Sequence, residues 1–183
     1  MSKMNKEIKV ETLEVLKNRR SIRKFKPEQI SADELDAVLD AGTFAPNGGG
    51  RQGFVIVAVQ DPAAVAKLDE LNAKALNAAP AGTHPYYGAP TVLLVLSTDA
   101  SVTPVEDCSA ITCNMLNAAY AIGLGSCWVH RCKEIVESPE GKALLKKWGL
   151  PENVRGVSSV ALGYPDCPHP GAEPRKSGLT LKV

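Results

Sequence analysis

The chain has 183 residues, of which 44% are hydrophobic and 22% charged, so we expect residues 1–183 to form one globular domain. This composition excludes a disordered chain or a fibrous repeat. The 21 basic residues nearly balance the 20 acidic ones, which argues against a general nucleic-acid binder. No apolar run is long enough to cross a bilayer, and an odd number of cysteines favours a reducing, cytoplasmic compartment.

Helix and strand signals alternate along the first half of the chain. Apolar residues spaced three apart predict a helix over residues 9–20. Ser31 and Glu34 have the spacing of a capping box, which predicts a second helix that ends near Gly42. The apolar run FVIVAV then predicts a buried strand over residues 54–59.

The same alternation continues in the middle of the chain. Pro62 suits the first turn of a third helix, and the residues 79–90, rich in Pro, Gly and Tyr, indicate a loop. A second apolar run predicts a buried strand over residues 91–97. Thr103 and Glu106 again have capping-box spacing and predict the start of a long helix.

That long helix carries a signal for self-association. We expect it to end near Ile122, and no charged residue lies between Asp107 and His130. A helix that is apolar on nearly all sides must be covered on nearly all sides, and a chain of this size can hardly surround one. We therefore expect a homodimer with this helix at its centre.

The last third of the chain is predicted to hold a strand over residues 126–129, a helix that starts at Ser138 and a strand over residues 157–162, followed by an irregular tail. No internal repeat or linker interrupts the pattern. The alternation alone predicts a three-layer α/β domain with helices on both faces of the sheet.

The segment KNRRSIRKFK, residues 17–26, holds six of the 21 basic residues and no acidic one. If the segment is extended after the helix, Arg19, Ser21 and Arg23 point to one side. Two guanidinium groups and a hydroxyl suit a phosphate group. The alternative is a solvated basic helix end, where cations complement the helix dipole.

A glycine-rich segment lies between the second helix and the first strand. Gly48, Gly50 and Gly53 match the spacing GxGxxG, but a helix precedes them and a strand follows, which is the reverse of the dinucleotide-binding fingerprint. The segment therefore indicates either a flexible backbone that approaches a ligand closely or an ordinary loop.

Several motifs, taken in order, resemble those of the FMN-dependent nitroreductase family in its short form. They are RRSIRKF, APNGGGRQ, an Ala-Pro pair before a strand, GLGSCW, and LGYP with a basic tail, and they cover about residues 13–176. The resemblance implies an α+β fold, a three-layer α-β-α sandwich with a mostly antiparallel central sheet, in an intertwined homodimer. It therefore replaces the α/β expectation.

The resemblance also implies two FMN sites at the dimer interface. The arginine segment and the basic tail would hold the phosphate, ribityl chain and ring edge, while the glycine loop would come from the partner subunit. The GLGSCW strand and the histidine after it would lie along the isoalloxazine face and its N5 edge. In this order, the residues implied are Arg19, Arg20, Ser21 and Arg23; Arg175 and Lys176; Pro46, Asn47, Gly48 and Gln52; and Trp128, Val129 and His130.

The implied activity is that of an oxidoreductase with NADH or NADPH as electron donor. Hydride would pass through flavin N5, in two alternating steps, to electron-poor acceptors such as nitroaromatics and quinones. No protein nucleophile is needed, and His130 is either a proton donor or an edge-strand histidine without a catalytic role.

The chain departs from the family pattern at several positions. The family often has glycines where His130 and Arg131 stand, an asparagine at Gly50 and a tryptophan at Phe54. The alternative function is therefore a flavin-binding protein of this fold with another role, as a dehydrogenase, a dehalogenase or a non-catalytic module.

A metal site is a further alternative. Cys127, His130, Cys132, Cys167 and His169 are all residue types that bind metals. Their spacing does not match a zinc ribbon, and strand alternation separates Cys127 from His130. We expect no metal.

Overall fold

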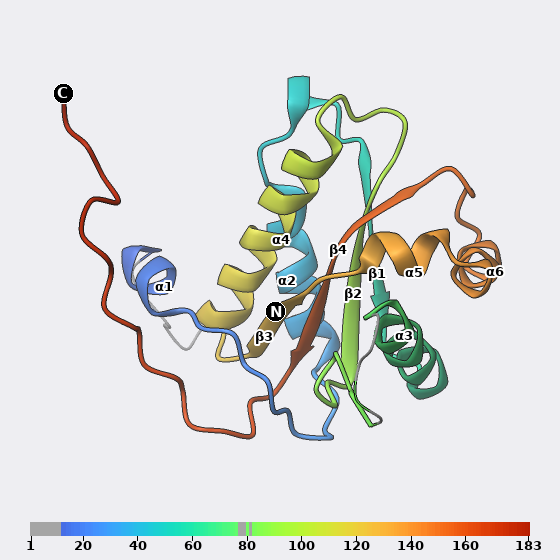
Figure 1. The fold of residues 1–183 in the computed structure, drawn as a ribbon, viewed down its shortest axis with the longest axis horizontal. Helices are drawn as coiled ribbons and strands as arrows, with labels where there is room; N and C mark the ends of the chain where they lie inside the picture. The colour runs from blue at the N-terminus through green and yellow to red at the C-terminus, as the bar shows by residue number, and fades with distance from the viewer. Residues whose placement is uncertain (1–11, 77–79, 81) are drawn as a thin grey trace.

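The protein folds as an α-β-α sandwich, seen in a computed structural model that describes residues 12–76, 80 and 82–183 (Figure 1). One sheet lies between two layers of helices, and an extended tail runs away from the body of the domain. In chain order, the elements are α1 (Thr12–Asn18), α2 (Ala32–Thr43), the 3-10 turn η1 (Gly48–Gly50), β1 (Phe54–Val59), α3 (Pro62–Ala75), β2 (Thr91–Ser97), α4 (Pro104–Ala121), β3 (Gly125–Val129), α5 (Cys132–Glu137), α6 (Pro139–Lys147) and β4 (Arg155–Gly163).

The central sheet has the strand order β1-β2-β4-β3, and every neighbouring pair is antiparallel. This confirms the α+β class and corrects the α/β expectation drawn from alternation alone. The error has a simple cause: α3 and a loop connect β1 to β2, and a connection of that length allows either strand direction.

The two core clusters lie on opposite faces of the sheet. On β2, Leu94 and Leu96 point into the cluster beneath α3 and α5, while Leu93 and Val95 point into the cluster beneath α2 and α4. All seven residues of β2 are buried, which is why this strand reads as a continuous apolar run. Among the described residues, no helix has the length and apolarity to span a membrane.

The segment that follows α1 is extended and lies along the ends of β3 and β4. The Ile22 amide donates to the Ser126 carbonyl at 3.0 Å, and the Lys26 amide donates to the Tyr164 carbonyl at 2.9 Å. The helix predicted over residues 9–20 is therefore shorter at its C-terminal end, and residues 9–11 lie outside the described part.

The two predicted capping boxes have opposite outcomes. At α2, the Glu34 amide donates to Ser31 Oγ at 3.2 Å and the Ser31 amide donates to Glu34 Oε2 at 2.8 Å, which confirms the first box. At α4, Thr103 makes no such bond, and its hydroxyl donates instead to Asp107 Oδ1 at 2.8 Å. The second predicted box was wrong because the Thr103 hydroxyl bonds to the Asp107 carboxylate, one turn into the helix, and not to a backbone amide.

Candidate functional site

The extended residues after α1 place alternate side chains on opposite sides. Ile22 is buried in the core, whereas Arg19 and Ser21 are half-buried and Arg23 is exposed. Their common neighbour is Cys127 on β3. Burial raises the pKa of the Cys127 thiol, while the charges of Arg23 and Arg19 and a hydrogen bond from Ser21 oppose that rise. Arg19, Ser21 and Arg23 therefore all act on the same buried thiol.

The Arg19 guanidinium is the exceptional group in this cluster. Its Nη1 is buried and has no hydrogen-bond partner among the residues that the structure describes. A buried charged donor without an acceptor is destabilising by roughly 1–3 kcal/mol or more. An anion bound between Arg19, Ser21 and Arg23 would supply the acceptor, so the cluster fits a phosphate group.

Arg20 lies on the opposite side from this cluster. It lines a cavity of about 150 Å³ together with Tyr120, Ser126 and His169, and its Nη1 donates to the Arg19 carbonyl. The structure therefore separates Arg20 from the other two arginines of the motif.

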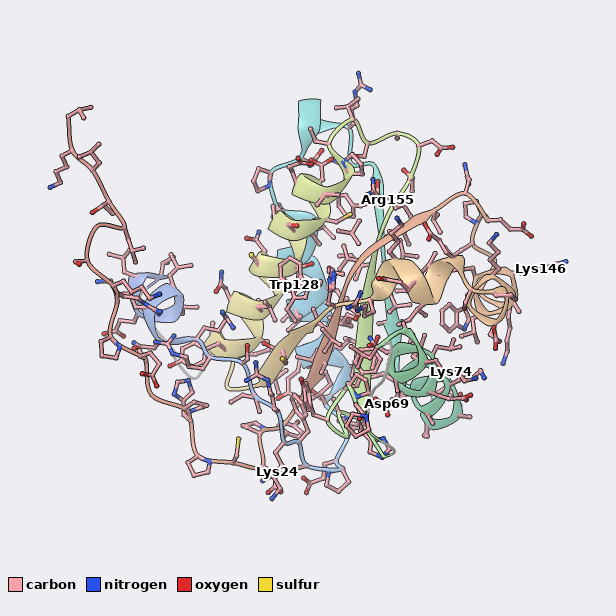
Figure 2. All side chains as sticks on the ribbon, viewed as in Figure 1. Lys24, Asp69, Lys74, Trp128, Lys146 and Arg155 are labelled. Carbon is pink, nitrogen blue, oxygen red and sulfur yellow. The ribbon has the colours of Figure 1, made fainter. Side chains whose placement is uncertain are left out.

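The residues at the end of β3 and in the turn after it differ in which of their groups a ligand could reach. Trp128 is half-buried and packs on the α4 side of the sheet, beside that helix in Figure 2. Val129 is 6% exposed and offers only its backbone to a ligand. His130 is exposed, and its carbonyl accepts a hydrogen bond from Asn72 Nδ2 at 2.9 Å. Arg131 follows with a φ of +78°, a conformation that favours glycine.

The glycine loop lies at the other end of α4. The Gly48 amide donates to Asp107 near the start of that helix, whereas the cavity lined by Arg20 contains Tyr120 near its end. At 1.5 Å per residue, these two positions on α4 are roughly 20 Å apart. Figure 1 shows η1 and the segment after α1 correspondingly far apart. One chain alone therefore does not bring Pro46, Asn47, Gly48 or Gln52 to the arginine cluster.

The loop itself is closed by an asparagine. Asn47 Oδ1 accepts a hydrogen bond from the Gln52 amide at 2.8 Å, and Asn47 Nδ2 donates to the Ala45 carbonyl at 3.3 Å. Gln52 has a φ of +50° and Gly50 one of +65°. The Asn47 side chain therefore holds the loop in shape rather than standing free for a ligand.

The basic pair of the tail is exposed. Arg175 and Lys176 lie in the irregular stretch that follows β4, and both side chains face solvent in the single chain. The structure does not bring them into an ion pair or hydrogen bond with another described residue.

The metal alternative finds no support in the geometry. Within the described ranges, no three His, Cys, Asp or Glu side chains are placed so that they could hold a metal ion. Cys127 and Cys132 are buried in the core, and the His169 ring packs at 5.4 Å from the Tyr120 ring.

Sequence reasoning missed two sets of polar residues that act on these segments. Asp107 is 3% exposed and accepts a hydrogen bond from the glycine loop. Ser159 Oγ donates to the Val129 carbonyl at 2.9 Å, beside the bond from Asn72 to His130. All of these contacts join residues distant in sequence, so local spacing gives no signal for them.

Known proteins resemble this chain in sequence and in fold. The sequence model described as "Nitroreductase family" matches residues 16–164. A protein of Archaeoglobus fulgidus, provisionally named an NADH dehydrogenase/NAD(P)H nitroreductase, is 33% identical over 161 residues, covering 85% of this chain and 86% of the relative. A protein of Methanothermobacter thermautotrophicus with the same name is 29% identical, covering 86% and 78%.

Among solved structures, a nitroreductase of Bacteroides fragilis with bound FMN superposes with a TM-score of 0.86 and 31% identity. The match covers 94% of this chain and 98% of that one.

Proposed function

Because the chain belongs to the nitroreductase family, we propose that it is an FMN-dependent oxidoreductase that uses NADH or NADPH to reduce small, electron-poor acceptors such as nitroaromatics and quinones. The names of its relatives and the FMN bound in the Bacteroides fragilis structure support the cofactor and the donor. The observation that carries the proposal within this chain is the buried, unpartnered Nη1 of Arg19.

The arginine cluster would hold the phosphate of FMN. Arg19 and Arg23 supply guanidinium donors and Ser21 a hydroxyl, and Arg175 and Lys176 of the tail would add positive charge. Bound FMN would supply the redox chemistry, because it accepts two electrons from a nicotinamide and passes them to an acceptor. Arg20 lines its own cavity and would contact the site through its backbone only.

The strand β3 would border the flavin ring. Trp128 offers an aromatic side chain, and Val129 offers backbone groups whose position is set by the hydrogen bond from Ser159. His130 is exposed at the end of the strand and is the candidate proton donor.

The active form would be an intertwined homodimer. The outer face of α4 carries no charge after Asp107 and leaves Cys113 exposed and Asn117 half-buried. Leu13 and Leu16 on α1 are 62% and 55% exposed beside this face, where α1 and α4 line a shared groove. A partner subunit on this face would cover these groups and would bring its own glycine loop to the arginine cluster.

The chain would work in the cytoplasm. All five cysteines carry free thiols, and a reducing compartment keeps thiols in that state.

Anaerobic mixing tests the proposal. The FMN-loaded protein is mixed with NADH or with NADPH, and flavin absorbance near 450 nm is followed; a nitroaromatic or a quinone is then added. We expect one nicotinamide to bleach the flavin and the acceptor to restore the colour. Bound FMN that neither nicotinamide bleaches would favour the alternative, a flavin-binding protein with another role, and failure to bind FMN would contradict both.

A further inference from the structure

We propose that Asp107 is a positioning residue of the FMN site: its buried carboxylate fixes the shape in which the glycine loop, residues 47–52, covers the flavin bound to the partner subunit. This inference rests on the proposed function, since it assumes that FMN binds. It adds a residue that has no contact with the cofactor and that acts through hydrogen bonds to the loop.

The first step of the argument is the set of partners of the carboxylate. Asp107 Oδ1 accepts from the Gly48 amide at 2.8 Å and from Thr103 Oγ1 at 2.8 Å, and Oδ2 accepts from Ser101 Oγ at 2.7 Å. These partners are a backbone amide and two hydroxyls, all uncharged. Hydrogen bonds to Ser101, Gly48 and Thr103 lower the pKa of Asp107 against the effect of burial, so the group is a carboxylate at neutral pH.

A buried charge without an ion-pair partner lowers the stability of the fold. The start of a helix does not require such a buried charge. The preceding residue, Glu106, is exposed in the same first turn of α4 and already complements the helix dipole. What distinguishes Asp107 from Glu106 is its bond to the loop.

The second step is the close packing of both ends of the loop. A Cβ atom added to Gly48 would overlap Thr103 Oγ1, and one added to Gly53 would overlap the Ser101 amide. Ser101 and Thr103 are the same two residues whose hydroxyls bind Asp107. The carboxylate therefore ties the turn before α4 and the start of the loop into one unit.

The third step is the lack of contacts at the loop's tip. A Cβ atom on Gly50 would meet nothing within 4 Å, and one on Gly49 would meet only the Arg51 side chain. The tip keeps its turn through the bonds from the Gly50 amide to the Asn47 carbonyl at 3.1 Å and from the Arg51 amide to the Gly48 carbonyl at 3.3 Å. Its link to α4 is the bond from the Gly48 amide to Asp107. Loss of the carboxylate would free one end and widen the range of loop shapes.

The surface around the loop is suited to a partner subunit. Phe44 precedes the loop and is 79% exposed, and Val102, in the turn bound by Asp107, is 56% exposed. Large apolar side chains exposed beside a pre-formed loop are typical of an interface. The loop would therefore be organised in one subunit and used by the site of the other.

Titration of the apoprotein with FMN tests the positioning role. We expect Asp107→Ala to raise the FMN dissociation constant at least tenfold and Asp107→Asn, which keeps an oxygen that can accept from the Gly48 amide, to stay within about threefold of the wild type. Gly48→Ala is a second variant that leaves the carboxylate in place and forces the loop away from Thr103, so it should weaken binding like Asp107→Ala.

The matched control is Thr112→Val. Thr112 lies on the same helix, is buried, and hydrogen-bonds with Ser158 in the core, remote from the loop. Its loss should lower the melting temperature while the FMN dissociation constant stays the same. If Asp107→Ala and Thr112→Val lower stability alike and both bind FMN as the wild type does, Asp107 is only structural and the inference is wrong.

Mixed dimers test the action across the interface. One subunit carries Asp107→Ala and the other Arg19→Ala. If each site joins the arginines of one subunit to the loop of the other, one site is intact and the mixed dimer binds one FMN tightly. If the arginines and the loop of each site belong to the same subunit, every site is impaired and no tight site remains. That result would overturn the cross-subunit role. Wild-type protein that binds no FMN would instead contradict the proposed function.

Discussion

Arg19 carries a charge that the chain itself does not satisfy. Its buried Nη1 lacks an acceptor among the described residues, while the neighbouring Lys24 is exposed and pairs with Asp166 at 2.8 Å (Figure 2). Two cations in one short segment therefore differ: Arg19 has a buried nitrogen without an acceptor among the described residues, and Lys24 forms a surface ion pair.

This difference predicts opposite effects on stability and on affinity. Arg19→Met should leave the free energy of unfolding of the apoprotein unchanged or raise it by about 1 kcal/mol, because an unpaired buried donor is removed. It should raise the FMN dissociation constant roughly 10- to 100-fold, the value of one charge-assisted hydrogen bond. Urea denaturation and fluorescence titration measure the two quantities.

Lys24→Met is the control for Arg19→Met. Since exposed ion pairs contribute about 0–1 kcal/mol, this change should alter stability little and leave FMN binding within twofold of the wild type. Equal loss of affinity in the two variants would show that general positive charge, and not the Arg19 guanidinium, holds the anion.

Single residues also show where prediction from the sequence succeeds. The capping box of Ser31 and Glu34 was readable because its two hydrogen bonds join residues three positions apart. The role of Asp107 could not be read from the sequence. An acid in the first turn of a helix normally complements the helix dipole, and the bond from Gly48 to Asp107 spans 59 positions of the chain. The αL conformation of Arg131 was equally hidden, because a residue other than glycine gives no signal for it.

At the scale of elements, α2 joins the sheet through a carboxylate at its first turn. Partial burial of Glu34 tends to raise its pKa, but hydrogen bonds from Tyr164 Oη and from Ser31 outweigh burial and lower the pKa below 4.5. The Tyr164 bond, at 2.7 Å, ties the start of α2 to the residue that follows β4.

The lowered pKa of Glu34 predicts a pH dependence of stability. A group whose pKa is lower in the folded state stabilises above the unfolded pKa and loses this effect as pH falls through the folded pKa. Glu34→Gln should therefore be less stable than the wild type by about 1 kcal/mol at pH 7, and the gap should close by pH 3. Urea denaturation at several pH values measures this gap, and a constant gap would exclude the carboxylate as its source.

The elements also differ in how well their sequences predict them. The strands β1 and β2 match the predicted residues, because a continuous apolar run bounded by turn residues has few alternatives. The helix α5 was missed, since six residues are too few to show a helical period. Antiparallel order came from family resemblance, because strand direction depends on contacts between distant segments.

At the scale of the whole molecule, the uncharged outer face of α4 predicts a dimer. Cys113 is exposed at the middle of this face, so Cys113→Arg should leave the fold intact and place a charge in the interface. We expect this variant to run as a monomer of about 19.4 kDa in light scattering and to lose FMN.

Ala143→Arg is the matched control for the dimer. Ala143 is exposed on α6, on the other side of the sheet, so the same new charge should leave the dimer and its FMN content unchanged. A dimer that survives Cys113→Arg would place the interface elsewhere.

The most direct test of the account is the FMN content of the purified particle. Light scattering combined with absorbance near 450 nm gives the mass of the particle and the number of flavins it holds. We predict a particle of two chains with one FMN for each chain after addition of excess cofactor and gel filtration. A colourless single chain under these conditions would contradict the account.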